Sequence, residues 1–213
     1  MLLRGDVTFR LLIEEDLDAV VDALDTPEVA RFLCYDDVTS VRWAVCRRWR
    51  KDVAGEAMTL IIRKAGRIVG WTGLLPMDGM PNELQTSTFL NPDVWGSGLN
   101  VLAKHVLWTA TELLGRRRLM FSIDSRNERS QAAAWKLFPN ATVIWLAAPS
   151  EPGVDVVLEA TEGPNAPGVL MPAERRDLEG LLRRHPGWRV WRVPEPPFDE
   201  SQPAGVAPVL SVA

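Results

Sequence analysis

A chain of 213 residues, of which 46% are hydrophobic and 24% charged, suits one globular domain or one domain with an appendage. Its formal net charge of −4 gives no overall positive field to attract nucleic acid, and its two cysteines and two histidines form neither a disulfide framework nor a zinc site. No apolar run approaches the roughly 20 residues of a membrane span, and no leader-like segment opens the sequence, so we expect a cytoplasmic protein with neither a metal nor a membrane partner.

The N-terminal part of the chain alternates between strand and helix patterns. Residues 7–12 alternate in polarity as a strand does, and acidic residues open a helix over 14–24, where the helix dipole favours them. The Thr-Pro pair within 26–33 supplies a cap and a first helical residue for a short helix. Residues 34–37 have the composition of a loop, and residues 41–53 carry apolar side chains at helical spacing.

The central part of the chain has the element order of a mixed sheet. The expected elements are strands at 58–63, 67–75 and 85–90, a helix from about 99 to 114, a strand at 118–124 and a helix at 128–137. A Lys-Ala-Gly turn joins the first two strands as a hairpin. The helix between the last two strands is the crossover that a parallel pair requires. The pattern therefore predicts antiparallel hairpins followed by a βαβ unit.

The C-terminal part is less regular. The elements expected there are strands at 141–147 and 154–160, a helix at 173–184 and an edge strand at 188–193. We divide the chain into a domain over 1–160, a divergent extension over 161–193 packed on the same domain, and a flexible Pro/Ala-rich tail over 194–213.

The chain is organised around a glycine-bearing turn, Asn91 to Asn100, between an expected strand and an expected helix. Glycine lets an anion approach the backbone closely, and the N–H groups and dipole at a helix start favour a phosphate there. A Gly-x-Gly pair is weak evidence by itself, since most such pairs only turn the chain. The spacing fits neither the Rossmann fingerprint, which needs a third glycine, nor the Walker A loop, which needs Gly-Lys-Ser/Thr.

Three motifs in order give this turn a context. Pro92 and Trp95-Gly96-Ser97-Gly98 precede a helix and a strand, and Asn127 with Ser130 opens the next helix. The arrangement resembles the GNAT superfamily of acyl-CoA-dependent N-acyltransferases and is similar to the branch that includes the ribosomal-protein N-terminal acetyltransferases. The resemblance covers about residues 7–137. It implies an α/β (α+β) fold: a mixed, mostly antiparallel central sheet with a parallel βαβ unit and helices on both faces.

The resemblance also implies acetyl-CoA or another acyl-CoA as the co-substrate. The turn would bind its pyrophosphate, with help from the Ser97 hydroxyl, and the strand before the turn would supply a backbone N–H to the thioester carbonyl. Asn127 would contact the pantetheine amides, and Ser130 matches a position near the thiolate. The ordinary interpretation of both residues is helix capping. The residues expected to bind the co-substrate are Phe89, Leu90, Trp95, Gly96, Ser97, Gly98, Leu99, Asn100, Asn127 and Ser130.

The acceptor amine must lose a proton, so a carboxylate or histidine is expected nearby. The sequence departs from the family at this point, because Gln85 and Leu102 stand where the related branch often has Glu. Glu83 is our first candidate for the base. Ser130 is the second candidate catalytic residue, acting as a hydrogen-bond donor or water relay to the thiolate because its hydroxyl is a poor acid.

Other charged residues leave alternatives open. Asp36, Asp37 and His105 are further candidate bases, although His105 is more simply a packed side chain, and water-relayed deprotonation also fits. The cluster Arg116 to Arg118 is either a solvated surface or a rim that attracts the phosphates of CoA.

The leading hypothesis is an N-acyltransferase that moves an acetyl or related acyl group from acyl-CoA to an amine of a small molecule or a peptide, by direct attack in a ternary complex. One alternative is a non-catalytic CoA-binding or sensing module, which the missing carboxylates favour. Another is a specialised biosynthetic acyltransferase with an unusual donor or acceptor, such as an aminoacyl-tRNA, although net acidity argues against a nucleic-acid partner. A homodimer stays open.

Overall fold

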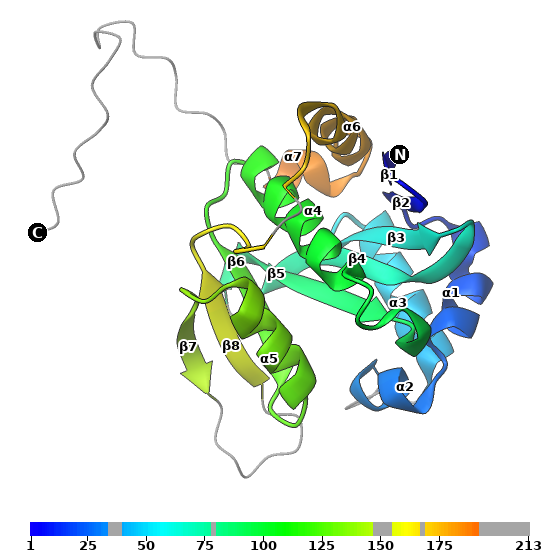
Figure 1. Ribbon diagram of the computed structural model, residues 1–213. Coiled ribbons are helices and arrows are strands. Elements are labelled where there is room, and N and C mark those ends of the chain that lie inside the picture. The colour runs from blue at the N-terminus through cyan, green and yellow to red at the C-terminus, as the bar shows by residue number, and fades with distance from the viewer. Residues whose placement is uncertain (34–39, 78–79, 147–154, 167–168, 192–213) are drawn as a thin grey trace, which may run out of the picture.

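The computed structural model describes residues 1–33, 40–77, 80–146, 155–166 and 169–191. An eight-stranded sheet with the strand order β1-β2-β3-β4-β5-β6-β8-β7 forms its centre (Figure 1). The strands are β1 (Leu2–Arg4), β2 (Val7–Leu11), β3 (Met58–Lys64), β4 (Arg67–Met77), β5 (Met80–Leu90), β6 (Leu119–Asp124), β7 (Thr142–Leu146) and β8 (Asp155–Ala160). Neighbouring strands are antiparallel except for β5 and β6, which are parallel.

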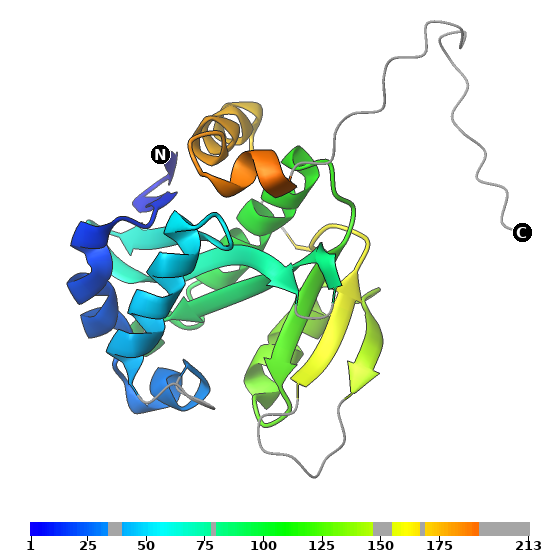
Figure 2. The ribbon, with the colours of Figure 1, turned by 180° about the vertical axis from the view of Figure 1, so that it is seen from behind.

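Helices cover both faces of this sheet, as Figures 1 and 2 show. The α-helices are α1 (Leu17–Leu24), α2 (Pro27–Leu33), α3 (Val41–Val53), α4 (Leu99–Leu113), α5 (Glu128–Leu137), α6 (Pro172–Leu182) and α7 (Gly187–Trp191). Helices α1 to α3 pack on one face, and α4 and α5 pack on the other. Helices α6 and α7 contribute to the same apolar core as α4, so the C-terminal segment packs directly on the sheet domain.

The alternation along β4 shows how one strand serves both cores. Trp71 packs with α1 and α3, whereas Leu74 packs with α4 on the opposite face. Side chains on a strand alternate between faces with a period of two, so a strand buried on both sides is apolar almost throughout. Within the described ranges, each helix is too short or too polar to cross a lipid bilayer.

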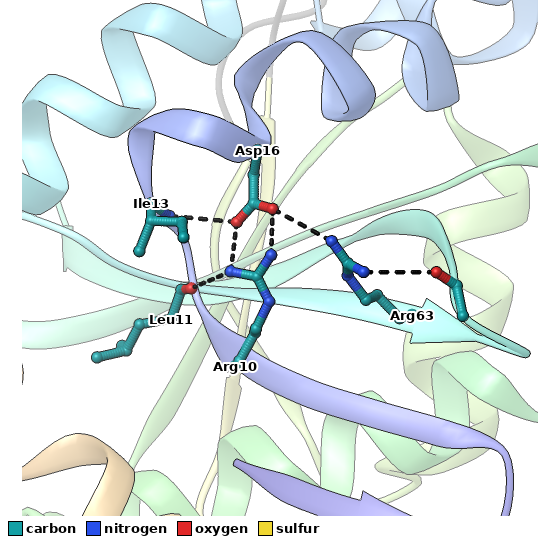
Figure 3. A network of polar contacts seen from close by, with 6 residues as sticks. Arg10, Leu11, Ile13, Asp16 and Arg63 are labelled. Atoms are coloured by element: carbon teal, nitrogen blue, oxygen red, sulfur yellow. Dashed lines mark hydrogen bonds and ion pairs between the residues drawn. The ribbon is translucent and has the colours of Figure 1, made fainter.

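A buried carboxylate fixes the start of α1 against the first strands (Figure 3). The Asp16 side chain is only 3% exposed, and it accepts hydrogen bonds from the guanidinium groups of Arg10 on β2 and Arg63 on β3. It also accepts the Ile13 backbone N–H at 3.3 Å. Because a buried charge needs partners, this network holds β2, β3 and the entry to α1 in one arrangement.

The C-terminal segment corrects one expectation and the N-terminus adds a strand. The expected edge strand at 188–193 is wrong, because Gly187–Trp191 is the short helix α7. Trp188 and Trp191 are three residues apart, which places both on one side of a helix, and both are buried in the core around α4. Strand β1 was not expected from the sequence. The predicted loop at 34–37 and tail at 194–213 lie outside the described residues.

Candidate active site

The turn between β5 and α4 is built from short local contacts. Its first part is a 3-10 turn at Pro92–Val94, in which the Asn91 side chain accepts the Asp93 N–H at 2.9 Å. The other end of the Asn91 amide donates to the Ala23 carbonyl at 2.7 Å, which ties the turn to α1. The Trp95 indole N–H donates to the Leu90 carbonyl at 2.9 Å. These bonds fix the path of the chain from the end of β5 to the first turn of α4.

Two glycines give the turn its conformation. Gly96 has φ +77° and Gly98 has φ +81°, in the left-handed region that other residues seldom adopt. A Cβ at either position would meet no described atom within 4 Å, so the outer side of the turn is open. Gly98 is the N-cap of α4 and supplies no side-chain cap to the helix. The first N–H groups of α4 therefore have no side-chain acceptor among the described residues.

Not every donor of the turn is available to a ligand. The Trp95 N–H donates to the Pro92 carbonyl at 3.0 Å and the Ser97 N–H to the Val94 carbonyl at 3.3 Å. The Ser97 hydroxyl also donates to the Val94 carbonyl, at 2.6 Å, so in this structure it serves the turn itself. The backbone N–H groups of Gly96, Gly98, Leu99 and Asn100 have no hydrogen-bond acceptor among the described residues.

The start of α5 lies beside this turn, although some thirty residues separate them in sequence. The Arg129 guanidinium stacks over the Trp95 ring, 3.6 Å from its centroid. The Asn127 side chain accepts the Ser130 N–H at 3.1 Å and caps α5. The tertiary fold thus brings both predicted motifs, the glycine turn and the Asn127-Ser130 helix start, to one region.

Strands β5 and β6 form a fork next to these two helix starts. Among the described residues they pair only at Gln85 with Met120 and Thr86 with Phe121, although β5 continues to Leu90 and β6 to Asp124. The backbone of β5 beyond Thr86 therefore has no β6 partner. A parallel ladder that stops early leaves N–H and C=O groups free to bind another extended molecule.

Comparison with known proteins identifies the family that has this glycine turn, helix start and strand fork. A sequence model of the family described as "Acetyltransferase (GNAT) domain" matches residues 6–137, which is more than half of the chain. The chain belongs to the GNAT acetyltransferase family. Among proteins with curated descriptions, no sequence match is found.

Solved structures of acetyltransferases share this fold. A protein from T. thermophilus, described as a candidate acetyltransferase, is 26% identical and has a TM-score of 0.59, with 84% of this chain and 95% of that chain covered. RimL, a ribosomal L7/L12 α-N-protein acetyltransferase solved with coenzyme A, is 17% identical with a TM-score of 0.59, covering 74% and 95%. An N-acetyltransferase from Staphylococcus aureus Mu50 is 15% identical with a TM-score of 0.55, covering 74% and 99%.

The family assignment confirms several expectations from the sequence. The fold is the predicted mixed sheet with one parallel pair, and the protein is an N-acyltransferase of the GNAT family with acyl-CoA as its co-substrate.

The structure places the predicted base, Glu83, in an ion-pair cluster. The Arg118 guanidinium donates to the Glu83 carboxylate at 2.5 Å and to the Glu159 carboxylate at 3.2 Å. Glu83 lies before the paired residues of β5, whereas the fork opens after them. The role of Glu83 as a base stays a prediction. Its carboxylate is paired with the Arg118 guanidinium. Asp36 and Asp37 lie outside the described residues.

Other predicted residues have structural partners. His105 is buried and its Nε2 lies 3.0 Å from the Ala166 carbonyl, which fits a packed side chain, and burial lowers its pKa. Arg116 donates to the Trp191 carbonyl at 3.0 Å. The arginine cluster follows the C-terminus of α4, a helix of fifteen residues, or about 22 Å at 1.5 Å per residue. Of the two interpretations left open for this cluster, the rim around the phosphate turn is therefore not supported, since that turn is at the other end of α4.

One polar residue of the fork was missed by sequence reasoning. Lys104 on α4 is buried, and its ammonium group contacts Thr86 and Thr88 of β5. A signal was present in the sequence, because position 104 lies three residues before Leu107 and therefore on the apolar stripe of the helix. A charged residue on a core-facing stripe is uncommon and marks a position to inspect.

Proposed function

We propose that this GNAT protein transfers an acyl group from acyl-CoA to an amine of a small molecule or peptide by direct attack in a ternary complex. The amine lone pair attacks the thioester carbonyl carbon, a C–N bond forms, and the C–S bond breaks with its electrons on sulfur. The amine loses a proton and the thiolate gains one, so no covalent enzyme intermediate is needed.

One observation carries this proposal. The open glycine turn at the start of α4 lies beside the β5–β6 fork and the Asn127-Ser130 start of α5. The free N–H groups of Gly98, Leu99 and Asn100 suit a diphosphate, because they combine with the dipole of α4. From Ser87 to Phe89, β5 pairs with β4 but with no described residue of β6, and this open side suits an extended pantetheine arm with amide groups. We assign the co-substrate to these groups.

The start of α5 supports the assignment of the thiolate end. The Asn127 side-chain carbonyl is used by the helix cap, which leaves its NH₂ group as a donor for pantetheine. Ser130 is half-buried, and its backbone N–H, not its hydroxyl, makes the capping bond. The hydroxyl is therefore available to donate to a thiolate, or to relay a proton from water.

Gly98→Ala tests the phosphate site, and Gly66→Ala is a matched control. Both glycines have a φ near +80° and open space where a Cβ would be added, but Gly66 lies in the β3–β4 hairpin. Each substitution strains the backbone by roughly 1–2 kcal/mol. We expect Gly98→Ala alone to weaken acetyl-CoA binding about tenfold or more in isothermal titration calorimetry. Equal affinities for both variants would place the diphosphate elsewhere.

A CoA-binding module without turnover is a second candidate. The observation that favours it is the pairing of Glu83 with Arg118, which leaves no free carboxylate at the position expected for a base. A panel of small-molecule and N-terminal peptide amines with acetyl-CoA separates the two, with release of the CoA thiol as the readout. Binding of acetyl-CoA without thiol release by any amine would support the module; amine-dependent release would support the transferase.

A further inference from the structure

The inner end of the β5–β6 fork holds a buried lysine. Lys104 lies in the second turn of α4, and the residue is 7% exposed. Its Nζ donates to the Thr88 hydroxyl at 3.0 Å and the Thr86 hydroxyl at 3.3 Å. It also lies 5.3 Å from the centroid of the Phe121 ring on β6. The ammonium group thus touches both arms of the fork at the point where they separate.

This ammonium has no charged partner of opposite sign among the described residues. Its described contacts are two neutral hydroxyls and an aromatic face, and none of the described carboxylates lies within ion-pair distance of Nζ. Burial in the apolar core removes water from the ammonium group and thereby lowers its pKa to about 7. A buried cation without a counter-ion is costly, and an anion that arrived beside it would relieve that cost.

The fork gives such an anion a way in. Thr86 is the last β5 residue that pairs with β6, and Thr88 lies beyond the pairing, on the same face of the strand. Both threonines are partly exposed whereas Lys104 is buried, so an anion would reach Nζ past these two side chains. If the pantetheine arm lies along β5, as the proposed function has it, the acyl group enters the fork at the level of these residues.

We propose that Lys104 makes this enzyme select an acyl donor whose chain ends in a carboxylate. The inference rests on the proposed function and adds the class of donor. A terminal carboxylate would accept a charge-assisted hydrogen bond from Nζ in a site of low dielectric, where such bonds are strong. An acyl chain that ends in a methyl group offers Nζ no acceptor. The hydroxyls of Thr86 and Thr88 hold Nζ toward the incoming group.

Binding of donor analogues tests this without knowledge of the acceptor amine. The probes are succinyl-CoA, butyryl-CoA, in which a methyl group replaces the carboxylate, and acetyl-CoA, titrated calorimetrically into the full chain. A charge-assisted hydrogen bond is worth about 1.5–3 kcal/mol, which corresponds to roughly 10- to 150-fold in affinity. We expect the unmodified protein to bind succinyl-CoA at least tenfold more tightly than butyryl-CoA. This comparison needs no variant.

Lys104→Met assigns the preference to the lysine, because methionine has a similar unbranched shape without the charge. We expect the variant to lose the succinyl preference and to bind butyryl-CoA as well as before. His105→Gln is the control, since His105 faces Ala166 instead of the fork, and it should keep the preference.

Three results would overturn the donor class, and one would overturn the function beneath it. No succinyl preference in the unmodified protein, a preference that survives in Lys104→Met, or an equal loss of all three donors in that variant each refutes selection by Lys104. Failure of the unmodified protein to bind any acyl-CoA would instead refute the proposed function.

Discussion

Lys104→Met should raise the free energy of unfolding, and by more at low pH than at high pH. In the unfolded chain the lysine amine binds a proton below its ordinary pKa of 10.5, whereas burial lowers the pKa in the folded protein to about 7. Between these two values the folded state binds fewer protons than the unfolded state, so stability rises with pH across this window. Below about pH 7 both states are protonated, and the full cost of the buried charge is present.

The magnitude follows from the same two pKa values. Each pH unit between them corresponds to roughly 1.4 kcal/mol, so the cost approaches an upper bound of about 5 kcal/mol at pH 6.5 and falls to about 1–2 kcal/mol at pH 9.5. Local relaxation and water entry lower both figures. Methionine removes the cost of the buried charge and keeps most of the apolar contacts of the lysine stem with the core around α4.

Urea unfolding of both proteins at pH 6.5 and pH 9.5 measures the effect. We expect a higher midpoint for Lys104→Met at pH 6.5 and a clearly smaller difference at pH 9.5, with similar denaturant dependence in all four experiments. A variant less stable than the unmodified protein at pH 6.5 would refute the reasoning. So would a stability difference that is the same at both pH values, since the cost would then not come from the charge.

Three further predictions concern the site and its support. Ser130→Ala should lower kcat severalfold, because it removes the hydroxyl proposed to donate to the thiolate. It should change KM for acyl-CoA little, because the capping bond of α5 uses the backbone N–H of this residue. An unchanged kcat would show that the hydroxyl takes no part in the chemistry. Arg129→Ala should weaken CoA binding severalfold, because the Trp95 ring loses the guanidinium stacked on it. Arg175→Ala, which breaks an exposed ion pair elsewhere, should leave CoA binding unchanged. Equal effects of the two substitutions in calorimetry would contradict a local role for Arg129. Asp16→Asn should destabilise the fold by about 3 kcal/mol in urea unfolding, because it removes the buried negative charge that two arginines share. A change below about 1 kcal/mol would show that this charge is dispensable.

Local sequence signals determined the features that depend on residues close together in the chain, such as helix starts and turns. The Ser40 hydroxyl accepts the Trp43 N–H at 3.2 Å and starts α3 where the pattern predicts it. The glycine turn before α4 was readable because positive φ angles at Gly96 and Gly98 require glycine. Such features depend on a few consecutive residues, so an isolated stretch of sequence contains the whole reason for them.

Tertiary structure decided the contacts that cross the chain. Trp188 and Trp191 form a helix and not a strand because a distant core buries both rings. Glu83 became an ion-pair partner because β5 and β6 are neighbours and bring Arg118 within reach, thirty-five residues away. Lys104 shows the same limit most clearly, since helical spacing places it on a buried stripe but only the sheet shows that the stripe faces the fork. The sequence by itself thus determined the family, the turn and the helix starts, whereas burial and long-range pairing, which no local pattern contains, decided which polar side chains meet in the site.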